Sequence, residues 1–440
     1  MKKLLAVITA AACLSFAFTG CKKQSKITLT MWHVYGEQAD SPMNDYVQEF
    51  NSTIGKDKGI IVNVTLMSNA SQIGEKLLNA QHGKAGVPSM PDLFFCHASN
   101  AEELGEENLV NWRDKFTRQE LDGFVQGFLS DGTVNGALSV LPVSKSTHLL
   151  FLAGNAFNRF AEKSGVTYDD LATWDGFFAT AEKYYEYSHG KPFCALDYLI
   201  RAVELDAISR GATDFYGENG WYKDDATLLG VYEKFANSIA KGHIVVSDLY
   251  SNTQVMTGET VAGISSSAAV LYYNDKITYP DNTSEYTNLQ VLPVLCSASG
   301  TKYATQAGVG LCAYKTTDRK AEAATVFAKW FTEEKRNLDF VAQTGYMPVK
   351  NGAFDKLSAY TFKTESFRNT YSALKTTVRT RTMLSEPNII GYYEKTHALY
   401  FAIRDLQRNL KEKYENGATT NDVTRELIEI FRNIPTRTVI

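Results

Sequence analysis

The sequence is poor in the residues that metal and disulfide sites need. Its 440 residues include 7 His and 6 Cys, and no two cysteines form a C-x-x-C pair, so we expect neither a metal site nor a cofactor. Cys96, Cys194, Cys296 and Cys312 lie in or at the end of apolar, strand-like runs. This setting favours small buried side chains over ligands.

A large excess of charge and a second long apolar run are also missing. The chain has 45 Lys and Arg against 49 Asp and Glu, which argues against a nucleic-acid partner because such proteins present a basic face. After residue 20 no apolar run approaches the length of a membrane-spanning helix. With 44% hydrophobic residues, the chain is long enough for two domains.

The N-terminal segment is typical of an export signal. Lys2 and Lys3 precede an apolar run over residues 4–18, and small residues lead directly into Cys21. A run of about 15 residues is shorter than the ~20 that a spanning helix needs. The layout resembles the lipobox of bacterial lipoproteins, with Phe18 at the position where Leu is usual.

This resemblance implies a signal peptide at residues 1–20, lipidation (palmitate or a related acyl chain) of Cys21, and a lipidated tether over 21–26. The protein is then exported and anchored to a membrane by lipid, facing the periplasm or the cell exterior. An ordinary secretory signal with an incidental cysteine remains the alternative. Export would permit disulfides, but spacing does not give their connectivity.

The chain after residue 26 alternates strand and helix patterns. "KITLTMWHVYG", "GIIVNVTLM" and "MPDLFFCHAS" read as strands, and "SPMNDYVQEFNST" and "ASQIGEKLLNAQHGK" as the helices between them. Strands separated by helices pair in parallel, which predicts an α/β fold. The part from Asp318 onward reads as helix-rich, and "RKAEAATVFAKWFTEEKRNLDFVAQTG" is its clearest helix.

Six segments carry a resemblance to a known family. In order they are "ITLTMWHVYG", "PDLFFC", "LPVSKSTHLLFLAGNAF", "TWDGFFATAEKY", "GETVAGISSSAAV" and "QAGVGLCAYKTTDRKAEAATVFAKWFTEEKRNLDFVAQTGYMPV". Together they resemble extracellular solute-binding protein family 1. These proteins are the sugar-capturing components of ABC importers and include relatives of the maltose- and glycerol-3-phosphate-binding proteins. The resemblance runs from about Ile27 to about Ile430.

The family implies a two-lobe, periplasmic-binding-protein-like fold of type II, with a hinge and an interlobe cleft. Lobe one would be 27–147 plus 305–349, and lobe two 148–304 plus 350–440. The implied function is a lipoprotein, not an enzyme, that closes around a mono- or oligosaccharide and delivers it to ABC permease subunits. We expect a monomer.

Sugars present flat C–H faces and a rim of hydroxyls, so a binding cleft needs aromatic platforms and paired polar groups. Strand ends of an α/β sheet are where ligands bind, and the family places further contacts at the lobe crossings and in "TGYMPV". The candidate ligand-binding residues are Trp32, His33, Tyr35, Glu37, His97, Ser99, Asn100, Ser146, Tyr198, Arg201, Ser266, Ser267, Gly308, Tyr346, Tyr392 and Tyr393. For the serines at 265–267, a turn that caps a helix is an equal alternative.

Two other functions stay open. An exported glycan-active hydrolase would need two carboxylates in one cleft or a G-x-S-x-G elbow, and "GISSSA" lacks the second glycine. A binder of a polyol phosphate would need a guanidinium. In an alignment with the glycerol-3-phosphate-binding relatives, the arginine that holds the phosphate corresponds to a position near Tyr393. The ligand-contacting aromatic and acidic residues correspond to Ala70 and Ala98. These departures favour a neutral carbohydrate.

Overall fold

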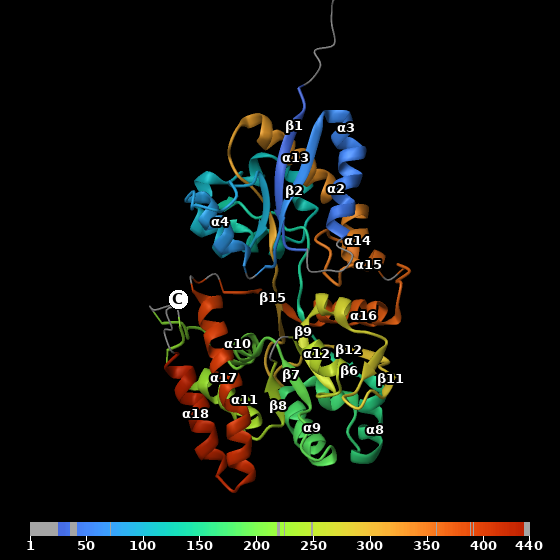
Figure 1. Ribbon diagram of the computed structural model, residues 1–440, viewed down its shortest axis with the longest axis vertical. Helices are drawn as coiled ribbons and strands as arrows, with labels where there is room; N and C mark the ends of the chain where they lie inside the picture. Colours follow the sequence, from blue (N-terminus) through green and yellow to red (C-terminus); the bar gives the residue numbers. More distant parts are fainter. Residues whose placement is uncertain are drawn as a thin grey trace, which may run out of the picture.

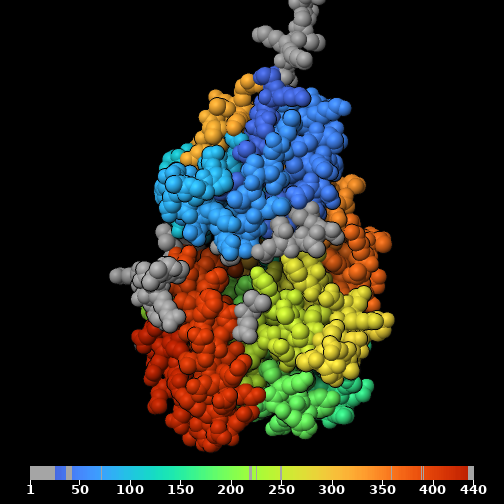
Figure 2. Space-filling view, in the orientation of Figure 1, coloured from blue at the N-terminus to red at the C-terminus, as the bar shows by residue number. Residues whose placement is uncertain are grey.

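The computed structural model describes residues 25–35, 42–70, 72–217, 221–223, 225–247, 250–357, 359–387, 389 and 391–434. The expected signal peptide, Cys21 and Glu37 lie outside the described residues. Two lobes stack along the long axis of the molecule (Figure 1). The blue upper lobe meets the yellow and red lower lobe along one seam (Figure 2).

A four-stranded sheet forms the centre of the upper lobe. Its order is β14-β3-β1-β2, with β1 parallel to β2 and β3, and β14 antiparallel to β3. The strands are β1 (Ile27–His33), β2 (Ile60–Met67), β3 (Leu93–Cys96) and β14 (Gly310–Ala313). All four residues of β3 are buried. The parallel strand–helix–strand pattern expected from the sequence is confirmed here.

The upper-lobe helices surround this sheet (Figure 1). The lobe also contains the short hairpin strands β4 (Thr133–Val134) and β5 (Ala137–Leu138). The helices are α2 (Pro42–Ser52), α3 (Ile54–Lys58), α4 (Ile73–Gln81), α5 (Ala98–Leu104), α6 (Arg118–Asp122), α7 (Gln126–Asp131), α13 (Asp318–Phe331), α14 (Glu334–Val341) and α15 (Ala353–Leu357). The single long helix that the sequence suggested after Asp318 is two helices, because the backbone leaves the helix at Thr332 and Glu333.

A five-stranded mixed sheet forms the centre of the lower lobe, in the order β12-β6-β9-β7-β8. Its strands are β6 (His148–Ala153), β7 (Cys194–Leu196), β8 (Ile244–Val246), β9 (Ala262–Ser266) and β12 (Leu289–Pro293). The hairpin β10 (Lys276–Thr278) and β11 (Ser284–Tyr286) lies beside it. The lower-lobe helices are α8 (Gly154–Ser164), α9 (Trp174–Tyr187), α10 (Leu199–Ser209), α11 (Ala226–Ala240), α12 (Ser251–Met256), α16 (Glu365–Thr380), α17 (Tyr392–Glu415) and α18 (Thr420–Arg432).

The chain passes between the lobes three times. The first passage leads from Leu141, bridged to Leu311, into β6, and the second leads from β13 (Tyr303–Gln306) into β14. The third follows α15, which contacts α14 of the upper lobe. The lobe boundaries expected at 147, 305 and 349 remain a prediction. Because α15 contacts α14, we propose that lobe one continues to Leu357.

A parallel two-stranded sheet lies at the waist of the molecule, where β13 pairs with β15 (Thr382–Ser385) (Figure 1). The sequence predicted that the C-terminal part is helix-rich, and it did not indicate this strand. A four-residue strand gives too short a pattern to recognise, and its partner lies about 80 residues earlier in the chain.

Asn337 ties the first passage to the segment that leads into α15. The side chain is fully buried; its Nδ2 donates to the Val143 carbonyl at 2.6 Å, and its Oδ1 accepts from the Val349 N–H at 3.1 Å. Asn337→Ala would leave both backbone groups buried without a partner, so we expect the free energy of unfolding to fall by about 2 kcal/mol. Urea denaturation measures this change. Asn158→Ala, at an exposed helical position, is the control and should change it little.

The four cysteines beyond residue 24 are buried free thiols, as their apolar settings predicted. Cys96 and Cys312 lie on neighbouring strands with their Sγ atoms 3.6 Å apart. Within the described residues no group of three or more His, Cys, Asp and Glu side chains is placed to hold a metal ion. No described helix combines the length and the apolar character that crossing a membrane requires.

Candidate functional site: a polar cavity between the lobes

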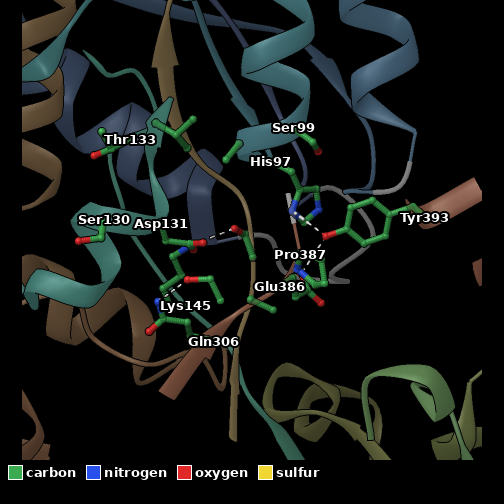
Figure 3. A pocket seen from close by; sticks show the side chains of 15 residues that line it. His97, Ser99, Ser130, Asp131, Thr133, Lys145, Gln306, Glu386, Pro387 and Tyr393 are labelled. Carbon is green, nitrogen blue, oxygen red and sulfur yellow. Dashed lines mark hydrogen bonds and ion pairs between the residues drawn. The ribbon is translucent and has the colours of Figure 1, made fainter. Parts of the chain in front are cut away.

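A cavity of about 250 Å³ opens where the lobes meet (Figure 3). Its walls come from the end of β3 and the start of α5, from α7, from the first two lobe passages, from the residues after β15, and from the start of α17. The volume is close to the lower end of the ~300–1,000 Å³ typical of small-molecule sites. Because both lobes and the passages between them contribute, lobe movement would change its shape.

One wall holds a buried ion pair. Lys145, 4% exposed on the first passage, bonds through Nζ to Asp131 Oδ2 at the end of α7. The same Nζ donates to the Gly308 carbonyl at 3.3 Å. The positive charge in this wall is therefore already neutralised, and the lysine connects α7 with both passages.

The opposite wall holds a carboxyl, a phenol and an imidazole in contact. The Tyr393 hydroxyl donates to Glu386 Oε2 at 2.7 Å and lies 3.5 Å from His97 Nδ1, and the Tyr393 and His97 rings are 5.1 Å apart between centroids (Figure 3). Burial raises the pKa of Glu386. Burial, with a smaller contribution from the Lys145 charge, lowers the pKa of His97 to about 4. The imidazole is thus neutral at pH 7.

The floor of the cavity is a turn of the second passage. Gly308 has φ +118°, a backbone conformation that residues other than glycine rarely adopt. It lines the cavity, as the sequence led us to expect, but the polar group it uses is a carbonyl that accepts from Lys145. Gln306 lies just before this turn and donates from Nε2 to the Ser385 hydroxyl at 2.9 Å.

The chemistry of the lining suits an uncharged ligand with many hydroxyls. Among the described residues that line the cavity, the Lys145 ammonium is bonded to Asp131, and no arginine is present. Glu386 Oε1 and Gln306 Oε1 have no hydrogen-bond partner within the described part of the chain, so they offer acceptors for ligand hydroxyls. An anionic ligand would meet carboxylates without a free cation.

Four of the predicted site residues come together here: His97, Ser99, Gly308 and Tyr393 line the cavity. Ser146 lies next to Lys145, and its backbone pairs with Ala307 in both directions, at 2.9 and 3.0 Å. Its role in the passage is therefore structural in this arrangement. The ligand-binding role of the four lining residues stays a prediction.

The aromatic residues expected to contact ligand at the end of β1 are buried and do not line the cavity. Trp32 is 1% exposed and its indole Nε1 donates to Thr65 Oγ1 at 3.1 Å. His33 is fully buried, and Tyr35, 1% exposed, bonds through its hydroxyl to Ser144 Oγ at 3.1 Å. These side chains pack inside the upper lobe. A strand with both faces covered gives no sequence signal that separates a core tryptophan from an exposed one.

Other predicted residues also lie outside the cavity lining. Asn100 packs against Gly74 of α4, and Ser266 caps the 3-10 turn η4 (Ser267–Tyr272) by accepting from the Ala268 N–H at 3.3 Å. The capping alternative for the serine run is thus the arrangement observed. Ser267 is fully buried.

Two predicted tyrosines pack against other rings. Tyr198 stacks on His148 with centroids 4.2 Å apart and an angle of 9°. Tyr346 meets Tyr35 edge to face, with the two centroids 6.1 Å apart. Neither lines the cavity described here.

Arg201 and Tyr392 were expected to touch the ligand, but neither side chain lines the cavity. Arg201 is 5% exposed and pairs with Glu204 at 2.9 Å, and Tyr392 is 4% exposed and donates to the same carboxylate at 3.1 Å. They are parts of a buried network behind the cavity wall. Each lies on a helix that faces the passages, so sequence position alone could not separate lining from support.

The lining residues that sequence reasoning missed include all those with a charged or amide side chain: Asp131, Lys145, Gln306 and Glu386. Lys145 is adjacent to the predicted Ser146. The motif therefore indicated the correct segment of the cavity wall, but the side chain that lines the cavity is Lys145. Gln306 is two residues from Gly308. Asp131 ends one short element and Glu386 follows another, and no local pattern indicates where their side chains point.

Solved structures define the class of this fold. A cyclic α-maltosyl-1,6-maltose-binding protein from Arthrobacter globiformis superimposes with a TM-score of 0.68 at 14% identity, over 93% of this chain and 99% of that one. UgpB from Mycobacterium tuberculosis, in complex with glycerophosphocholine, gives a TM-score of 0.65 at 15% identity, over 94% and 100%. The chain has the two-lobe, α/β fold of periplasmic sugar-binding proteins.

The family follows from the sequence match. Residues 45–365 match the model of the bacterial extracellular solute-binding proteins, and the chain belongs to this family. It is also similar to an arabinooligosaccharide-binding protein of Bacillus subtilis, with 24% identity over 213 residues. That alignment covers 47% of each protein, so the chain spans about half the length of this relative.

Proposed function

We propose that the protein captures a carbohydrate between its lobes and delivers it to the permease of an ABC importer. The observation that carries the proposal is the lining of the interlobe cavity, where hydrogen-bonding groups are plentiful and the buried cation is already paired. Membership of the solute-binding family and similarity to an arabinooligosaccharide-binding protein support it. The protein acts by binding, as a monomer, and releases its ligand unchanged.

A thermal-shift panel tests this function. The probes are arabinotriose, maltotriose and glucose, with glycerophosphocholine as the phosphodiester. A ligand present at a hundredfold excess over its Kd stabilises the folded state by about 2.7 kcal/mol. We expect a sugar to raise the Tm and to be recovered intact by chromatography.

The same panel separates the two alternatives. Shortened sugar products would show a hydrolase. A shift with glycerophosphocholine and none with any sugar would favour the phosphate ester, although the cavity offers no unpaired cation among its described lining residues.

We further propose that the protein is exported and held to a membrane by lipid at Cys21. The support is the sequence alone, since this segment lies outside the described residues. Cys21→Ser removes the thiol that would accept the lipid. In cells expressing this variant we expect the protein to leave the membrane fraction or to keep its signal peptide, as judged by fractionation and mass. Mature, membrane-bound protein in the variant would contradict the lipid anchor, and Cys96→Ser is the matched control.

A further inference from the structure

A fully buried carboxylate lies behind the cavity wall in the lower lobe. Glu204 on α10 is 0% exposed, and its Oε1 accepts hydroxyls from Tyr216 at 2.5 Å, from Tyr392 at 3.1 Å, and from Tyr222. Its Oε2 accepts from Arg201 Nη1 at 2.9 Å. Three phenols and a guanidinium therefore saturate one carboxylate.

The guanidinium of Arg201 also binds both strands of the waist sheet. Its Nε donates to Thr305 Oγ1 on β13 at 3.1 Å. Its Nη2 donates to the carbonyls of Leu384 and Ser385 on β15, at 3.1 and 2.6 Å. Thr305 is the register partner of Leu384, so one planar group fastens the two strands at the same level.

Three of the residues held by this network directly precede a residue that lines the cavity. Thr305 precedes Gln306, Ser385 precedes Glu386, and Tyr392 precedes Tyr393. These three lining residues come from three separate segments of the chain. The network around Arg201 and Glu204 supports all three segments, in addition to the β13–β15 pairing and the bond from Tyr393 to Glu386.

We propose that Arg201, held by Glu204, is the positioning residue of the ligand cavity and sets the relative placement of Gln306, Glu386 and Tyr393. This inference rests on the proposed function for its consequence in binding, but not for the mechanical coupling itself. Arg201 does not touch the ligand; it acts through the backbone of β13 and β15 and through Glu204.

The choice of side chains fits this role. A buried ion pair costs free energy unless every hydrogen bond is satisfied, and a hydrophobic pair of the same size is often as stable. What it offers instead is geometry, because a guanidinium presents several donors in one rigid plane. Lysine keeps the charge but provides one nitrogen, so it can satisfy Glu204 without holding both strands.

Arg201→Lys tests the inference, with Arg210→Lys as matched control. Arg210 is the C-terminal cap residue of the same helix and pairs with Asp206 at 2.8 Å, away from the cavity lining. We measure amide hydrogen exchange by mass spectrometry without ligand. In Arg201→Lys, exchange in peptides covering 303–306, 382–387 and 391–394 should rise at least tenfold, while peptides from β1 and β6 stay unchanged. Arg210→Lys should leave all of them unchanged.

The binding readout uses the sugar of the panel that shifts the wild type most. Arg201→Lys should weaken its affinity by about tenfold, because displaced lining residues lose hydrogen bonds to the ligand. Local exchange equal to the wild type would overturn the inference, as would uniformly raised exchange. If no sugar binds the wild type, the proposed function fails, while the exchange result still judges the positioning role.

Tyr392→Phe covers the case in which Arg201→Lys does not fold. It removes one hydroxyl from Glu204 and keeps the ring. We expect raised exchange confined to 391–394 and 382–387. The control is Tyr232→Phe, which removes a buried hydroxyl that donates to the Leu427 carbonyl at 3.2 Å. It should leave the exchange of these peptides unchanged. Unchanged exchange in Tyr392→Phe would contradict the coupling.

Discussion

Glu386→Ala is expected to lower carbohydrate affinity by about 100-fold while leaving the Tm of the empty protein unchanged or higher. Glu386 faces the cavity with one oxygen bonded to Tyr393 and the other unpartnered within the described chain. Each hydrogen bond from a ligand hydroxyl to this side chain contributes about 1.5 kcal/mol, so losing two of them costs about 3 kcal/mol of binding free energy.

Stability should move in the other direction. Burial raises the pKa of Glu386, which means that the ionised carboxylate is held in a place that disfavours its charge. Removing it relieves that cost in the empty protein. Isothermal titration calorimetry measures the affinity and a thermal melt measures the Tm, each at pH 7.

The control for Glu386→Ala is Glu285→Ala. Glu285 lies on the β10–β11 hairpin, and its carboxylate pairs with Arg159 of α8. The Glu285 variant should bind the sugar like the wild type. A Glu386 variant with wild-type affinity would show that the ligand lies elsewhere in the cleft.

The second large effect is the loss of folding stability at low pH. His148, 4% exposed, begins β6 and stacks on Tyr198. Burial, followed by the nearby charge of Arg201, lowers its pKa from 6.5 to about 3. In the unfolded chain the His148 imidazole is therefore protonated as the pH falls through 6.5, whereas in the folded protein it stays neutral until the pH is near 3. The stability from the neutral imidazole is complete above pH 6.5 and is lost as the pH falls from 6.5 towards 3.

Between pH 6.5 and pH 4 this single histidine should reduce the free energy of unfolding by about 3 kcal/mol. In His148→Phe, which keeps a ring against Tyr198, that part of the decline should disappear. Urea denaturation at several pH values checks it, and the difference at pH 7.5 gives the packing effect of the substitution alone. A variant as acid-sensitive as the wild type would show that His148 is not the group responsible.

Much of the architecture could be predicted from local pattern. The alternation of β1, α2, β2, α4 and β3 gave the parallel sheet of the upper lobe, and the ordered motifs gave the two-lobe class. Helix starts follow local chemistry as well: Pro42 is the first residue of α2, and at the start of α9 Thr173 accepts from the Gly176 N–H. These features depend on neighbours in the chain.

The site was harder to predict because it depends on contacts between distant segments. Trp32 and Tyr393 are both aromatic residues at the end or start of an element, yet one is in the core and the other lines the cavity. Arg201 has the charge of a ligand contact, but its partners lie about 100 and 180 residues further along. Nothing in its local sequence distinguishes support from recognition.

The pairing of β14 with β3 has a consequence for how the protein acquires its shape. The upper sheet takes its first three strands from residues before 97 and its fourth from residues after 309. A chain emerging from its N-terminal end cannot complete this sheet until the intervening segment has appeared. Closing so long a loop is entropically costly and makes assembly slow. We therefore expect the lower sheet, whose strands all lie within 148–293, to mature first, leaving the edge of β3 exposed in the interval.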